Sequence, residues 1–358
     1  MDIAFTEDKA KKDKNTAFYN ATPIKFCCVG ATGVGKTSML TSMYHELDKG
    51  GVSRFSIDTT SELGRNTTER LQKSMKQMLR PIDNTEPFSV VEESGIASTR
   101  YTAQISEFIG SYEVYDDSII AKMFGKPKKS FSFPFHFIDM PGEWYEPKHA
   151  KHPEAVEHLR SSLVSFIAVD TPALMENDAM CQESNLVLSI SELYKGATLD
   201  KLKQSKHSVI FVLSKCEHLC KTTEKVETML KRLDQSSTYG LLIKRLKDNG
   251  IPVYVTWIQT LGGLEFFQYK SINEDADKMA TFIKTGSYAP DNCAAPLMLA
   301  LKYGLKHAID TINTIISDSY LQKFLKAMGW TNKTLAIKAA ESLVAQLGNA
   351  PKYKYKKL

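Results

Sequence analysis

The strongest constraint on the fold is the glycine-rich segment at residues 30–37, Gly-Ala-Thr-Gly-Val-Gly-Lys-Thr. A short apolar run at 24–29 precedes it and is typical of a buried strand, whereas 36–47 has the composition of a helix. Glycines let backbone N–H groups turn inward around phosphate oxygens, and the N-terminus of the following helix adds the positive end of its dipole. The order strand, glycine loop, helix therefore predicts a loop that binds the phosphates of a nucleotide.

Short apolar segments alternate with helical segments in the second half of the chain. Such alternation predicts a mainly parallel sheet covered by helices on both faces. We therefore expect an α/β fold, the three-layer α/β/α arrangement of P-loop nucleoside triphosphatases, with a helical C-terminal extension formed by 297–316 and 321–347. The expected strands are 163–169, 209–213 and 253–258. The expected helices are 155–161 and 179–194, with one or two helices over 222–247.

Residues 51–131 interrupt this alternation. Expected there are a helix at 61–79, a loop at 81–100 and β-like stretches near 101–109 and 117–124, with a hairpin leading into an aromatic-rich strand at 131–138. One elaborated domain is the simplest division of the chain. It comprises a polar lead-in at 1–22, a nucleotide-binding domain at 23–300 with an insertion at about 51–131, C-terminal helices at 301–347 and a basic tail at 348–358.

Composition excludes several classes of protein. The formal charge of +5 is mild for 358 residues, so nucleic acid is not required as a partner. No stretch approaches the ~18 apolar residues of a membrane span, and the polar N-terminal region lacks an apolar signal core. Cys27 and Cys28, two of the six cysteines, lie in the expected strand at 24–29, where free thiols behave as small hydrophobes. These features lead us to expect a cytoplasmic protein.

Within the glycine loop, two side chains have specific expected roles. Lys36 should reach the β- and γ-phosphates, and the hydroxyl of Thr37 should ligate Mg²⁺. The remaining contacts should come from the backbone. The expected nucleotide-binding residues of this segment are Gly30, Ala31, Thr32, Gly33, Val34, Gly35, Lys36, Thr37 and Ser38.

A second motif, Asp139-Met140-Pro141-Gly142-Glu143, follows the expected strand at 131–138. Asp139 is expected to hold Mg²⁺ opposite the loop, directly or through water. Asp-x-x-Gly is typical of switch loops, in which the N–H of the glycine, here Gly142, contacts the γ-phosphate until hydrolysis frees the loop. Glu143 could orient a water molecule or act as a base. Lys36, Gly142 and Glu143 are the expected catalytic residues.

Together the two motifs resemble those of the translation-factor-related class of P-loop GTPases. More narrowly, they are similar to the predicted bacterial double-GTPase (DO-GTPase) domains, which carry Gly-x4-Gly-Lys-Thr followed by Asp-x-Pro-Gly-Glu. The resemblance covers roughly residues 24–300 and is specific at 30–37 and 139–143. It implies a GTPase fold, Mg²⁺ and a protein effector or activator of unknown identity.

The base-recognition turn is expected at 214–217, Ser-Lys-Cys-Glu, where a GTPase carries Asn/Thr-Lys-x-Asp after a strand. Lys215 would lie against the base, while Ser214 stands in for Asn or Thr. Glu217 replaces the aspartate that accepts hydrogen bonds from N1 and N2 of guanine. Its side chain is longer by one methylene group, so GTP is the favoured nucleotide and ATP is the alternative. Thr260 lies where members of the family have a loop that contacts guanine O6.

A threonine of the first switch should close over Mg²⁺ together with Thr37 and Asp139. Thr85 is the first choice, because the resemblance places a threonine after a proline there, and Thr59 and Thr60 are its rivals. Cys216, His218 and Cys220 do not have the spacing of a closed zinc site, so local packing explains them better.

The leading hypothesis is a Mg²⁺-dependent GTP-binding protein that hydrolyses GTP slowly and acts as a switch. Two alternatives remain open. One is an ATP-binding ATPase or phosphotransferase, which the presence of Glu143 and Glu217 favours. The other is a nucleotide-bound scaffold without turnover, in which the helical region at 297–347 binds a partner.

Overall fold

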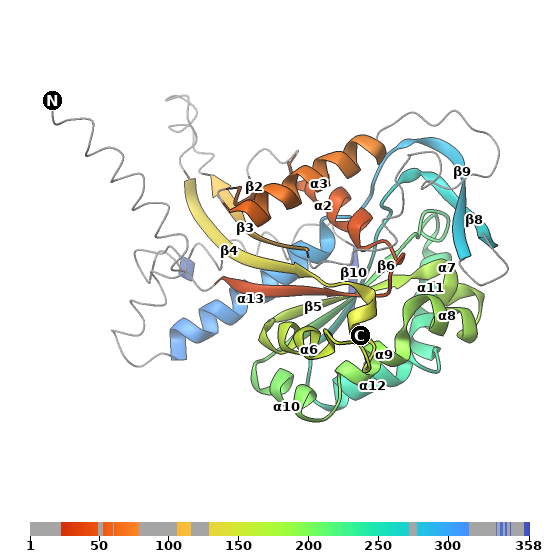
Figure 1. The fold of residues 1–358 in the computed structure, drawn as a ribbon. Coiled ribbons are helices and arrows are strands. Elements are labelled where there is room, and N and C mark those ends of the chain that lie inside the picture. Colours follow the sequence, from red (N-terminus) through yellow and green to blue (C-terminus); the bar gives the residue numbers. More distant parts are fainter. Residues whose placement is uncertain are drawn as a thin grey trace.

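The structure is a computed structural model that describes most of the chain between residues 23 and 314 and a short C-terminal segment. The described residues form an eight-stranded sheet with helices on both faces and a separate two-stranded sheet (Figure 1). Among the described helices, none combines the length and the apolar character that crossing a membrane requires. The described ranges are 23–48, 53–59, 61–78, 106–115, 129–271, 278–314 and 354–358, with Thr334, Ile337, Lys338, Glu341 and Val344.

The strand order of the main sheet is β10-β7-β6-β5-β1-β4-β3-β2. The five strands from β7 to β4 run parallel to one another, whereas β3, β2 and β10 are antiparallel additions at the two edges. This mixed, mostly parallel sheet confirms the expected α/β fold. The strands span β1 Ile24–Val29, β2 Ser53–Ile57, β3 Ser106–Tyr115, β4 Lys129–Asp139, β5 Val164–Asp170, β6 Ser208–Ser214, β7 Val253–Trp257 and β10 Tyr355–Lys357.

Two hydrophobic cores, one on each face of the sheet, hold the layers together. Successive side chains of a strand point to opposite faces, so Phe26 and Cys28 of β1 enter one core and Cys27 and Val29 the other. The first core is covered by α2 Lys36–Asp48, α3 Glu62–Met78 and α13 Ala295–Thr314. The second is covered by α6 His152–Ser161, α7 Thr171–Glu176, α8 Asp178–Asn185, α9 Val187–Leu193, α10 Gly196–Gln204, α11 Thr223–Gln235 and α12 Tyr239–Asp248.

The expected single helix at 179–194 is wrong, because the structure has two helices there, α8 and α9. Leu186 separates them with a left-handed φ of 49°. The cause is a long-range contact: the side-chain oxygen of Asn185 accepts from the backbone N–H of Asp170 at 2.6 Å, which turns the chain at the end of α8. A contact between residues 15 positions apart leaves no signal in the periodicity of a helix.

A second difference is the hairpin of β8 Gly262–Ser271 and β9 Lys278–Tyr288, which the sequence did not predict. Two irregularities in its register interrupt the period-two alternation that identifies a strand. The hairpin lies outside the main sheet (Figure 1), and the hydroxyl of Tyr288 lies 3.3 Å from that of Ser42 on α2.

The antiparallel partner of β4 also differs from the expected one. The sequence favoured a hairpin from 117–124 into the strand at 131–138, but β4 pairs along its length with β3. The stretch at 117–124 lies outside the described residues, as do the lead-in at 1–22, the loop at 81–100 and most of the expected helix at 321–347.

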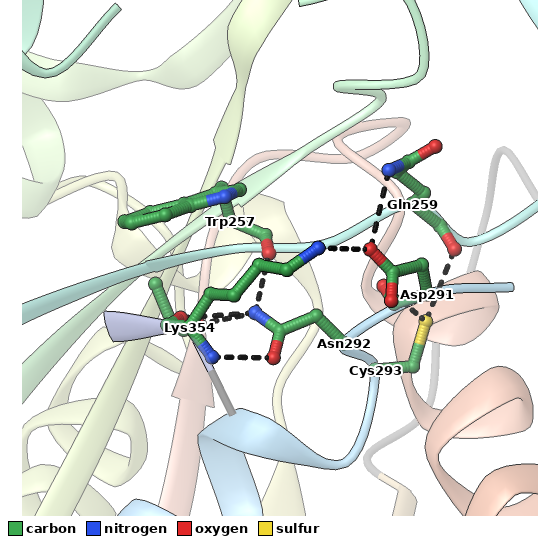
Figure 2. A network of polar contacts seen from close by, with 7 residues as sticks. Trp257, Gln259, Asp291, Asn292, Cys293 and Lys354 are labelled. Atoms are coloured by element: carbon green, nitrogen blue, oxygen red, sulfur yellow. Dashed lines mark hydrogen bonds and ion pairs between the residues drawn. The ribbon is translucent and has the colours of Figure 1, made fainter. Parts of the chain in front are cut away.

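Residues 355–357 of the basic tail pair with β7 as strand β10. Asn292, which is buried, anchors this strand (Figure 2). Its amide group donates to the carbonyl oxygens of Trp257 at 2.8 Å and Lys354 at 2.9 Å, and its side-chain oxygen accepts from the N–H of Lys354 at 2.8 Å. The ammonium of Lys354 pairs with Asp291 at 2.7 Å on the surface.

Replacing Asn292 by glycine should lower the free energy of unfolding by about 2 kcal/mol, because several buried backbone groups lose their partner. Glycine also tolerates the left-handed φ of 61° at this position. Urea denaturation measures the loss. Lys354→Gln is the matched control, since it removes only an exposed ion pair worth less than about 1 kcal/mol. Equal losses in the two variants would contradict the anchoring role of Asn292.

A buried hydrogen-bonded chain joins β5 to α9 and β6. Nδ1 of His207 lies 2.8 Å from the carbonyl oxygen of Ser162 and must donate to it, so Nε2 accepts from the hydroxyl of Ser165 at 2.9 Å. That hydroxyl oxygen in turn lies 2.7 Å from the hydroxyl of Tyr194. Burial lowers the pKa of His207 to about 4. The imidazole is therefore neutral in the folded protein at pH 7.

Stability should fall as the pH drops from about 6.5 towards 4, because the unfolded chain then binds a proton that folded His207 excludes. The contribution is fully present above pH 6.5 and amounts to about 3 kcal/mol. Urea denaturation at pH 7.5 and pH 5.0 measures the part that is lost by pH 5.0, about 2 kcal/mol. His207→Gln should flatten the dependence, and an unchanged slope in this variant would assign the effect to other groups.

Candidate functional site

The glycine loop connects the end of β1 to the first residue of α2. Gly33 and Gly35 have φ values of +82° and +99°, which side-chain-bearing residues rarely adopt. Gly30 is constrained differently, because a Cβ atom there would lie 3.1 Å from the carbonyl oxygen of Ala168 on β5. The backbone geometry thus accounts for all three glycines of the motif.

Lys36 is folded back into this loop. Its side chain is buried, and the ammonium donates to the carbonyl oxygens of Gly30 at 2.5 Å and Ala31 at 3.0 Å. An ammonium has three donors, so these bonds leave one for a ligand. Thr37 and Ser38 are partly exposed in the first turn of α2, and Thr32 is exposed on the loop.

Asp139 lies at the end of β4, directly across from Cys28 of β1 in the parallel register. Its side chain is 3% exposed, and its Oδ1 atom is buried with no hydrogen-bond partner among the described residues. Burial raises the pKa of Asp139, whereas the charges of Lys36 and Arg70 act in the opposite direction. A buried carboxylate oxygen without a partner is costly unless a ligand satisfies it.

The segment after Asp139 lies directly against the glycine loop. A Cβ atom on Gly142 would come within 2.5 Å of the backbone nitrogen of Thr32. The buried hydroxyl of Tyr145 can donate to the carbonyl oxygen of Met140 at 3.1 Å or that of Cys28 at 3.2 Å, which links the segment to β1. Glu143 is partly exposed at the start of this short 3-10 turn, Gly142–Tyr145.

Ser214 joins the turn at 214–217 to the glycine loop. Its hydroxyl is buried at the end of β6 and lies 2.6 Å from the carbonyl oxygen of Val34 and 2.8 Å from that of Val169. A hydroxyl has one proton, so the two carbonyl oxygens share it. Lys215 follows with a left-handed φ of 57°, and its ammonium pairs with the carboxylate of Asp170 at the end of β5.

Glu217 reaches the loop that contains Thr260. Its side chain is 3% exposed, and Oε1 accepts from the backbone N–H of Leu261 at 3.1 Å. Oε2 is buried and has no hydrogen-bond partner within the described residues. Burial raises the pKa of Glu217, whereas hydrogen bonds from backbone N–H groups and the charge of Lys215 act in the opposite direction. Thr260 is buried as well, and its carbonyl oxygen accepts from Ser42 on α2 at 2.8 Å.

Within the described part of the chain, none of the threonines expected in the first switch lies at this site. Thr85 and Thr60 lie outside the described residues, and Thr59 is exposed with its carbonyl oxygen accepting from Arg65. Cys216 is buried and packs locally, with its thiol 3.2 Å from the carbonyl oxygen of Leu213. The described part of the chain contains no cluster of three His, Cys, Asp or Glu side chains that could hold a metal.

Asp170 and Asn185 are two site residues that the sequence reasoning missed. Asp170 pairs with Lys215 and also caps α7, because its Oδ1 atom accepts from the N–H of Ala173 at 3.2 Å. An acidic residue followed by Thr171-Pro172 is a helix-start signal, so the capping role was accessible from the sequence. The contact of Asn185 with Asp170 was not, since it joins separate elements.

Comparison with solved structures found chains that are similar to this one. The chain is similar to the signal recognition particle receptor SRb in its complex with GTP and SRX from Chaetomium thermophilum, with 17% identity, a TM-score of 0.33 and coverage of 67% of this chain and 92% of that one. It is also similar to the S. cerevisiae Ski7 GTPase-like domain bound to GDP and inorganic phosphate, with 17% identity and a TM-score of 0.36. That similarity covers 70% of this chain and 46% of the Ski7 chain.

No protein-family model matches the sequence, and no curated protein does. The resemblance of the motifs to translation-factor-related GTPases and the narrower resemblance to double-GTPase domains both remain predictions. Because both TM-scores are low, any conclusion about function depends on the residues of the site.

Replacing Asp139 by asparagine should raise the stability of the ligand-free protein by about 1 kcal/mol, because it removes a charge whose burial is incompletely compensated. Thermal and urea denaturation measure the change. The exposed Asp200→Asn is the control and should leave the stability within about 0.5 kcal/mol of wild type. A destabilised Asp139→Asn variant would mean that the carboxylate is fully paired in the ligand-free fold.

Proposed function

We propose that this chain is a Mg²⁺-dependent GTP-binding protein that hydrolyses GTP slowly and acts as a nucleotide-controlled switch. The observation that carries the proposal is the convergence of three features at one edge of the sheet. These are the glycine loop with Lys36, the buried Asp139 with an unsatisfied oxygen, and Gly142 against the loop backbone. Parallel strands place such features together because their carboxyl ends meet at the same edge.

The residues present fit a magnesium ion. Thr37 and Asp139 offer a hydroxyl and a carboxylate, the oxygen ligands that Mg²⁺ takes alongside phosphate oxygens and water. The unsatisfied Oδ1 atom of Asp139 is the observation that favours such a ligand. A bound Mg²⁺ would neutralise charge on the phosphates. Thr85 remains our prediction for a further ligand.

The turn at 214–217 favours guanine over adenine. Guanine presents N–H donors at N1 and N2, whereas adenine presents an acceptor at N1. The Oε2 atom of Glu217 is a buried acceptor that lacks a partner among the described residues, so guanine would satisfy it and adenine would leave it unpaired. The bond from Oε1 to Leu261 also accounts for the longer side chain, because one oxygen is used to hold the other in place.

The contact between Gly142 and Thr32 supports the switch. The close approach of the two backbones leaves little room between them, so a γ-phosphate at the loop would move the segment 139–146 or reorient its N–H groups. Glu143 lies at the start of this segment and could orient water for hydrolysis. Its negative charge beside a polyanion is less suited to this task than a neutral glutamine, and we expect turnover of about 10⁻⁴ to 10⁻² s⁻¹ without an activator.

Calorimetric titration with GTP and ATP, each with and without Mg²⁺, tests the proposal. We expect GTP to bind in a Mg²⁺-dependent manner and ATP to bind at least about tenfold more weakly, a difference of ~1.4 kcal/mol. Lys36→Ala should abolish binding of both nucleotides while leaving the protein folded.

Three outcomes would contradict parts of the proposal. Absence of binding by either nucleotide would overturn nucleotide recognition altogether. Equal or tighter binding of ATP would overturn the guanine assignment and leave the ATPase or phosphotransferase alternative. Bound GTP that survives prolonged incubation with Mg²⁺ would overturn hydrolysis and favour a nucleotide-bound scaffold.

A further inference from the structure

The side chain of Lys215 is held before any nucleotide binds. Its ammonium pairs with Asp170, and both side chains are largely buried, with exposed fractions of 14% and 4%. Lysine side chains normally sample many conformations, so an ion pair in this setting selects a small set of them. The left-handed backbone of Lys215 restricts the residue further.

Asp170 is itself fixed by two further contacts. Its second carboxylate oxygen caps α7 through Ala173, and its backbone N–H donates to the side-chain oxygen of Asn185 at 2.6 Å. The amide nitrogen of Asn185 lies 3.4 Å from the carbonyl oxygen of Asp170, so the side chain of Asn185 contacts both backbone groups of one residue. Asn185 is completely buried.

The same junction between α8 and α9 also supports the glycine loop. Leu186, the residue after Asn185, packs against a small apolar cluster of Ala31 and Val34 from that loop and Ala168 from β5. Two consecutive residues therefore contact both halves of the site, the phosphate side through Leu186 and the base side through Asp170.

We propose that Asp170 and Asn185 are positioning residues that hold Lys215 in place against the nucleobase, and so make the site select a nucleotide over a bare polyphosphate. This inference rests on the proposed function. The ion pair acts in two ways. It lowers the conformational cost of ordering Lys215 on binding, and it neutralises an ammonium that would otherwise attract the phosphates of a ligand away from the glycine loop.

The test compares the affinities of GTP and inorganic tripolyphosphate, both with Mg²⁺, in wild type and in Asp170→Asn. The substitution keeps the shape of the side chain, an oxygen for capping α7 and the backbone contacts with Asn185. We expect the affinity for GTP to fall about tenfold and that for tripolyphosphate to stay the same or rise, because the freed ammonium attracts phosphate. Asn185→Ala should act in the same direction.

A double-mutant cycle links the effect to Lys215. If Asp170 acts through Lys215, adding Asp170→Asn to Lys215→Ala should weaken GTP binding no further. The control is Asp178→Asn, which removes an ion pair with Arg232 on the same helical layer, and it should leave both affinities unchanged.

The failures of the two proposals are distinguishable. A wild-type protein that binds neither GTP nor tripolyphosphate overturns the proposed function and this inference with it. A wild-type protein that prefers GTP, with Asp170→Asn showing the same preference, overturns this inference alone. Parallel losses of GTP and tripolyphosphate affinity in Asp170→Asn would also overturn it, because they would indicate a general structural role.

Discussion

The parallel pairing of β1 with both β4 and β5 is the constraint on which the rest of the site depends. It brings the end of β4, and with it Asp139, level with Cys28 just before the glycine loop. It also places β5 so close that Gly30 cannot carry a side chain beside Ala168. Ser214 extends the arrangement to β6, because one hydroxyl proton is shared between the loop and β5. The glycine loop, Asp139 and the turn at 214–217 therefore lie together at one edge of the sheet.

Two buried carboxylates with unsatisfied oxygens lie at this edge of the sheet. Asp139 and Glu217 each keep one oxygen that is buried and lacks a partner among the described residues. Sites prepared for a ligand commonly carry such costs, since the groups that bind it are poorly satisfied in its absence. The fold offsets these costs elsewhere, through the aromatic core around Phe26, Phe137 and Phe166. A ligand that satisfied these oxygens would therefore stabilise the folded protein.

Sequence reasoning succeeded where structure depends on local pattern. The glycine loop, the strand ending at Asp139 and the central parallel strands follow from periodicity and turn chemistry, and the structure has them. It failed where a contact between distant residues determines the local structure. At Asn185, the hydrogen bond with Asp170 lies where an apparently continuous helix divides into α8 and α9. It also missed β8 and β9, because irregular register hides their alternation. Thr85 lies outside the described residues, so its role remains a prediction.

The C-terminal strand has a consequence for how this sheet is completed. β10 pairs with β7, and Thr256 donates to Lys354, a residue 98 positions further along the chain. During synthesis, the outer N–H and C=O groups of β7 stay unpaired until that stretch has emerged. An open strand edge is a template for association with other chains. β10 covers this edge of β7 and moves the open edge of the sheet to a strand of 3 residues, and short edge strands offer little template for association.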